Sequence, residues 1–160
     1  MQRVWTVERF SYIFAALGSL FALGAGAAMA LQPAVNAKLR EQCNHPLQAS
    51  VVSFGVGLLA LLGLATLLRV GVPSVERLQT LPAWAWTGGL LGTYMVTVSL
   101  LVAPAMGATR WIALVLAGQM VVSLVLDHFG WLGYAQHAFT WPRIFGVLCV
   151  VLGVLIVMRN

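Results

Sequence analysis

The chain has 160 residues, of which 61% are hydrophobic and 8% are charged, and its mean hydropathy is +0.92. A soluble domain needs a polar shell, and this composition cannot supply one, so the chain is expected in a lipid bilayer. The net charge is +5, and the basic residues lie at the ends of apolar runs, which favours contact with lipid headgroups and not with nucleic acid. The length leaves room for one membrane domain, 1–160, and no separate soluble domain.

Five apolar runs follow one another, each close to the ~20 residues that a helix needs to cross a hydrocarbon core of ~30 Å. Backbone groups in lipid must be bonded within the segment, and no run shows the two-residue alternation of a barrel strand. The sequence therefore predicts an all-α polytopic membrane protein with five transmembrane helices. The spans are expected at about 12–38, 46–68, 83–103, 108–127 and 142–158.

Proline marks the ends of these runs. Pro46, Pro82 and Pro142 stand at or just before the start of a run, where the missing N–H costs nothing. Pro104 follows the third run and is expected to end it. Pro33 is followed by more helical sequence, so it predicts a kink in the first span.

The first run also resembles a secretory signal, because basic residues precede it and it ends in Ala28-Met29-Ala30. It is longer than the apolar region of a signal peptide, so a retained first span is the expectation.

Five spans place the two termini on opposite sides of the membrane. Orientation follows the excess of Lys and Arg on the cytoplasmic side, and here the two sides are nearly equal. This balance predicts insertion in both orientations and antiparallel pairs, with a single orientation favoured by a narrow margin as the alternative. The N-terminal side has five basic residues, Arg3, Arg9, Arg69, Arg77 and Arg143, and the other side has four, Lys38, Arg40, Arg110 and Arg159.

Small residues recur at four-residue spacing in two spans. Such a stripe lets two helix backbones approach closely in lipid, within one chain or between two. The predicted helix-packing positions are Gly18, Ala22, Gly26 and Ala30 in the first span, continuing to Ala34, and Gly88 and Gly92 in the third.

Polar side chains within the spans are the candidate substrate-binding groups. Gln32 and Asn36 share one face of the first span, and Gln119, Ser123 and Asp127 form one stripe on the fourth. Gln119 follows Ala108 by 11 residues, which places its amide about 16 Å into the membrane. The predicted substrate-binding residues are Gln32, Asn36, Tyr94, Gln119 and Ser123, and the three amides are expected to line one cavity shared by an antiparallel pair.

Structural roles remain open for the same residues. Gln119 could bond another helix instead of a ligand. The hydroxyls of Thr93, Thr97 and Ser123 are expected to bond the carbonyl four residues earlier.

Asp127 is the only acid in or near an apolar run, so it is the candidate for coupling to protons, with an interfacial role as the alternative. His45, His128 and His137 are expected in loops and lack metal-ligand spacing. No nucleophile–base arrangement is visible, so the chain is not predicted to be an enzyme, and no metal or cofactor is expected.

Several motifs together resemble the YdcZ-like family of the drug/metabolite transporter (DMT) superfamily. They are GAGAAMALQPAVNAKL over 24–39, SFGVG over 53–57, WAWTGGLLG over 84–92, AGQ over 117–119 and DHFG over 127–130. The resemblance implies that the chain forms one five-span half of a DMT (EamA-like) transporter. It also implies pairing with an inverted copy or a close paralogue, and a multi-pass location in the prokaryotic inner membrane.

The function implied by the resemblance is secondary transport of a small molecule by alternating access. Small multidrug resistance proteins of the same superfamily use a glutamate in the first span. Here no carboxylate lies between Glu8 and Glu41. This favours a neutral, zwitterionic or lipophilic substrate. A non-transporting assembly or regulatory subunit, packed by its small-residue faces, is the alternative function.

Overall fold

The computed structural model describes the backbone of residues 2–159 and the side chains of residues 17–159, and all regular structure in that part is helical. Five of its helical segments are long and apolar enough to cross a membrane. The elements are α1 (Gln2–Arg40), α2 (Pro46–Leu67), α3 (Val75–Gln79), the 3₁₀ helix η1 (Ala83–Thr87), α4 (Gly88–Met106), α5 (Ala108–Phe129), the 3₁₀ helix η2 (Trp131–Gly133) and α6 (Trp141–Arg159).

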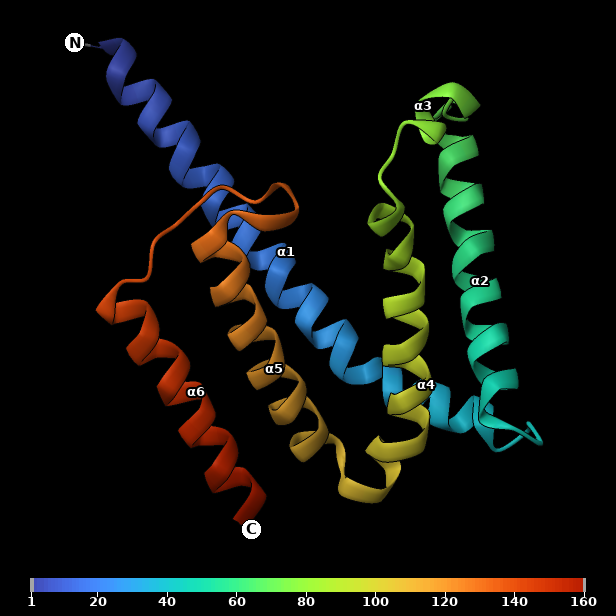
Figure 1. The fold of residues 1–160 in the computed structure, drawn as a ribbon. Coiled ribbons are helices and arrows are strands. Elements are labelled where there is room, and N and C mark those ends of the chain that lie inside the picture. Colours follow the sequence, from blue (N-terminus) through green and yellow to red (C-terminus); the bar gives the residue numbers. More distant parts are fainter. Residues whose placement is uncertain (1, 160) are drawn as a thin grey trace.

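The helices form an open arrangement around α1 (Figure 1). In that view α1 runs diagonally, with α2 and α4 side by side on one flank and α5 and α6 side by side on the other. The end of α4 turns directly into α5, while α5 and α6 are joined by a longer loop. The first turns of α1 and the last turn of α6 lie at opposite ends of the bundle.

Few side chains are buried in this arrangement. Ala49, Val96 and Leu100 form the central cluster, where α2 meets α4. The accessible surface is 12833 Å² for a chain of 17.2 kDa, whereas a compact soluble monomer of that mass would expose about 7,800 Å². The extra surface is largely apolar, so the bundle needs lipid or another protein around it.

The prediction that Pro104 ends the third span is wrong. α4 continues through Pro104 to Met106 and ends at Gly107, whose φ of 88° takes the chain out of the helix. Pro104 has no N–H for the carbonyl of Leu100, four residues earlier. Arg40 of α1 donates to that carbonyl instead, so the helix tolerates the proline because another helix supplies the missing donor.

Other boundaries agree with the proline pattern. α2 begins at Pro46, and His45 caps it by accepting from the N–H of Leu47 while Gln48 bonds back to His45. α1 continues through Pro33, and its axis changes direction in that region.

The loop after α5 is held against the end of that helix. Gly130, at φ 62°, ends α5, and His128 lies in the last turn of the helix, so its predicted place in a loop is wrong. The N–H of His137 donates to the carbonyl of Asp127, and Phe139 both stacks on His128 and donates to its Nδ1. The bond from His137, together with one from the side chain of Gln136 to the carbonyl of His128, satisfies carbonyls that the helix end leaves free.

Candidate functional site

A large groove lies between α1 and α5. Its volume is about 690 Å³, within the range of small-molecule sites. No charged side chain lines it, and its polar side chains are Ser19 and Gln119. The remaining lining residues are Ala22, Leu23, Gly26, Ala27, Met29, Ile112, Val115 and Leu116.

Gln119 is exposed in this groove and makes no hydrogen bond with another described side chain or with the described backbone. Its place on α5, 11 residues after Ala108, puts the amide near the middle of the bilayer. An amide at that depth is costly unless something hydrogen-bonds to it. The groove therefore presents a hydrogen-bonding amide in a largely apolar surface, as ligand sites commonly do.

Part of the small-residue stripe of α1 lines the same groove. Ala22 and Gly26 line it, and a Cβ added at Gly18, Gly26 or Gly88 would meet nothing within 4 Å. Gly92 differs, because a Cβ there would lie 3.5 Å from the ring of Phe54 on α2. Within one chain, Gly92 is at a close helix contact, whereas the face of α1 at Gly18 and Gly26 is uncovered.

Gln32 lies in a different groove, between α1, α2 and α4. This groove has a volume of about 380 Å³ and is lined also by Phe54 and Val96. Asn36 is only 4% exposed, and its Nδ2 has no hydrogen-bond partner among the described residues. The amides of Gln32, Asn36 and Gln119 therefore have separate surroundings within one chain. Neither of these grooves brings the three amides together within one chain.

The hydroxyls of the spans have mostly structural bonds. Thr93 donates to the carbonyl of Gly89 as predicted, and Ser123 donates to Met120, three residues earlier instead of four. The expectation for Thr97 is wrong, because its hydroxyl lies 3.1 Å from that of Ser50 on α2. The two residues face each other where α2 packs on α4. Tyr94, by contrast, is 70% exposed on α4.

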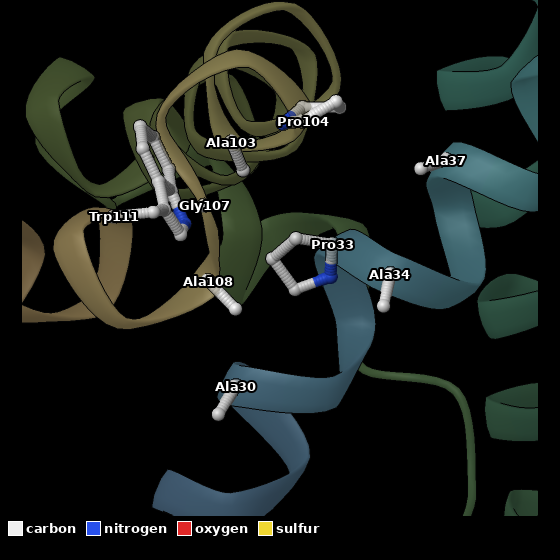
Figure 2. A pocket seen from close by; sticks show the side chains of 9 residues that line it. All are labelled: Ala30, Pro33, Ala34, Ala37, Ala103, Pro104, Gly107, Ala108 and Trp111. Atoms are coloured by element: carbon white, nitrogen blue, oxygen red, sulfur yellow. The ribbon is translucent and has the colours of Figure 1, made fainter.

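A smaller cavity of about 220 Å³ lies where α1 crosses the α4–α5 turn (Figure 2). The ring of Pro33 points from α1 toward that turn, and the walls are otherwise mainly alanines, Pro104 and Trp111. Trp111 is 7% exposed, and its Nε1 lacks a hydrogen-bond partner in the described part of the chain. Trp111 lies three residues after the start of α5, and its burial at this corner was not evident from the sequence.

Asp127 lies at a fourth site, between α5 and α6. Its carboxylate is 3.6 Å from the guanidinium of Arg143, and both side chains are partly exposed. Sequence reasoning named Asp127 but not Arg143, because 16 residues separate them and only the loop's return brings them together. Within the described residues, no group of three or more His, Cys, Asp and Glu side chains is placed to hold a metal ion.

The fold and these grooves define a helical, multi-pass membrane protein with five candidate spans. The family model described as "Putative inner membrane exporter, YdcZ" matches residues 17–156, and the chain belongs to that family. The predicted family and inner-membrane location are thereby confirmed. No curated protein and no solved structure matches the chain significantly.

Proposed function

We propose that the groove between α1 and α5 is the substrate site of this exporter, and that Gln119 binds the substrate there. The observation that carries the proposal is the unpartnered Gln119 amide near mid-membrane, in an apolar groove of about 690 Å³. Of the neutral, zwitterionic and lipophilic substrates expected from the sequence, this groove favours a neutral or lipophilic one, because no charged residue lines it and each charge of a zwitterion would be unpaired and desolvated there.

A second copy in the opposite orientation would complete the site. The uncovered stripe at Gly18 and Gly26 suits close contact with another helix, and the balance of basic residues between the two sides suits both orientations. In such a pair, Gln32 of one copy would join Gln119 of the other, with Tyr94 as an aromatic wall and Ser123 one turn further along α5. Asn36 is buried within one chain, so it would line this cavity only when the contacts around it open during transport. Rocking of the two copies would expose the cavity alternately to each side.

Asp127 is the proposed coupling residue, because it is the one acid inside a candidate membrane span of the described residues. Its carboxylate lies 3.6 Å from the guanidinium of Arg143, so the pair links the charge of Asp127 to the contact between α5 and α6.

The substitution Gln119→Leu tests the site. A solute screen by thermal stabilisation first identifies a ligand, because binding to the folded state raises apparent stability by about 2.7 kcal/mol at 100 times Kd. The variant should lose this stabilisation and lose flux in proteoliposomes, while its own melting temperature stays close to that of the parent. Gln79→Leu, which removes an exposed amide in α3, is the matched control.

The opposite pattern would contradict the proposal. If Gln119 bonds another helix, Gln119→Leu should lower the melting temperature while surviving protein still binds the ligand. A non-transporting assembly subunit is the alternative function favoured by the uncovered stripe of α1. It predicts no flux of any solute in proteoliposomes that contain correctly assembled protein.

A further inference from the structure

A cavity of about 320 Å³ between α5 and α6 combines an ion pair with an apolar wall. Asp127 and Arg143 lie at one end of it, where α5 ends and α6 begins. From there the lining continues along α5 to Met120, seven residues and about 10 Å toward the middle of the membrane. The other lining residues are Ser123, Leu124, Gly146 and Val147.

Both charges stand at the unfavourable end of their helix. Asp127 is in the last turn of α5, where the helix dipole is negative, and Arg143 is in the first turn of α6, where it is positive. Exchanging the two residues would keep the pair and remove both conflicts. Local stability therefore does not explain this arrangement, and such departures are typical of functional positions.

The neighbouring loop leaves the charged groups available. Its hydrogen bonds go to the carbonyls of Asp127 and His128 and to Nδ1 of His128, and not to the carboxylate or the guanidinium. The pair itself is loose, with 3.6 Å between Nη1 of Arg143 and Oδ2 of Asp127 and side-chain exposures of 41% and 36%. A ligand can therefore reach one positive and one negative group side by side.

We infer that this cavity binds a zwitterionic phospholipid with a primary ammonium group, such as phosphatidylethanolamine. The ammonium would bind Asp127, the phosphate would bind Arg143, and an acyl chain would lie along the wall from Leu124 to Met120. Three features fit this ligand: charges of both signs, a position at the end of two spans, and an apolar wall that continues into the membrane. The cavity is separate from the proposed substrate groove, which lies between α1 and α5, although it is lined by Ser123 and by Asp127, the proposed coupling residue.

Charge complementarity separates this lipid from other abundant ones. A phosphatidylglycerol headgroup is anionic and offers Asp127 neutral hydroxyl donors but no cation, so it lacks the charge-assisted bond that an ammonium group makes. A phosphatidylcholine headgroup has a cation without N–H donors, so it cannot hydrogen-bond the carboxylate. The expected order of retention is therefore phosphatidylethanolamine first, with the other two below it.

The test is lipid retention by the purified full-length protein, measured by native mass spectrometry after exchange into equimolar mixtures of the three lipids. The parent should retain phosphatidylethanolamine selectively. Asp127→Asn and Arg143→Gln should each lower that retention about two- to fivefold, the range for a partly exposed ion pair. Glu76→Gln and Arg77→Gln, which remove charges in α3 on the same side of the membrane, are the matched controls and should change nothing.

A second variant keeps the test valid if the charge variants fold poorly. Gly146 lines the cavity, and a Cβ added there would meet nothing within 4 Å, so Gly146→Leu should fill the wall without disturbing the helix. It should reduce retention, whereas Gly153→Leu, at an equally open position of α6 outside the cavity, should not.

Three results would overturn the inference. One is equal retention of phosphatidylglycerol and phosphatidylethanolamine by the parent. Another is unchanged retention in the Asp127, Arg143 and Gly146 variants. The third is displacement of the lipid by free phosphoethanolamine at concentrations similar to that of the lipid, because the site would then bind a soluble solute and make no use of the apolar wall.

Discussion

The bond from Arg40 to the carbonyl of Leu100 should be needed only because residue 104 is proline. In the parent, Arg40→Met removes the donor and leaves a carbonyl of α4 unsatisfied. Hydrogen bonds to charged groups contribute about 1.5–3 kcal/mol, and Arg40 is half-buried, so we expect a loss near the lower end of that range. In Pro104→Ala the backbone N–H returns to Leu100, and the same Arg40→Met change should then cost at most about 0.5 kcal/mol.

A double-mutant cycle measures this coupling directly. The four proteins are unfolded reversibly in mixed micelles, with tryptophan fluorescence as the signal, and the interaction energy is taken from the four free energies of unfolding. We expect a coupling of about 1 kcal/mol or more. Lys38→Met is the control, because Lys38 pairs with Glu41 on the exposed side of α1 and should not couple to Pro104. Additive effects of Arg40→Met and Pro104→Ala would refute the proposed compensation.

Three further outcomes are expected. Gly26→Leu should reduce dimer yield and leave the thermal stability of a monomeric fraction unchanged, whereas Gly92→Leu should destabilise the monomer because the new side chain meets Phe54. Cross-linking yield and melting temperature, measured on the same samples, check both effects. Reversed effects of the two variants would contradict the assignment. Thr97→Val should cost about 0.6–1.7 kcal/mol of unfolding free energy in the parent and close to nothing in a Ser50→Ala background. Two lysines added at either terminus should shift the orientation measured by terminal reporter fusions, and one fixed orientation in every version would argue against dual insertion.

The sequence was a good guide to the spans because each depends on its own composition. A run of about 20 apolar residues must be helical in lipid whatever lies beside it, so the five segments could be located without tertiary information. The end of α4 could not be located in this way. The effect of Pro104 depends on Arg40, a residue 64 positions earlier in the chain that packs beside it only in the folded bundle.

The candidate site was less predictable for the same reason. Helical spacing placed Gln32 and Asn36 on one face of α1, but it could not show that Asn36 is buried while Gln32 lines an open groove. It also could not pair Asp127 with Arg143 or Thr97 with Ser50. These pairings depend on which helices become neighbours, and alternating polar and apolar faces leave several arrangements open.

The sparse contacts between helices have a consequence for how the chain is made. Insertion of each span during synthesis must depend mainly on its own hydropathy, because the spans bury little surface against one another. The first span, Leu17–Arg40, is the least apolar of the five and includes two amides, whereas α6, the fifth span, is the most apolar. The first span usually determines the orientation of a membrane protein, but here it is the span with the weakest tendency to insert. We therefore expect the orientation to be decided only after the more apolar later spans have been synthesised.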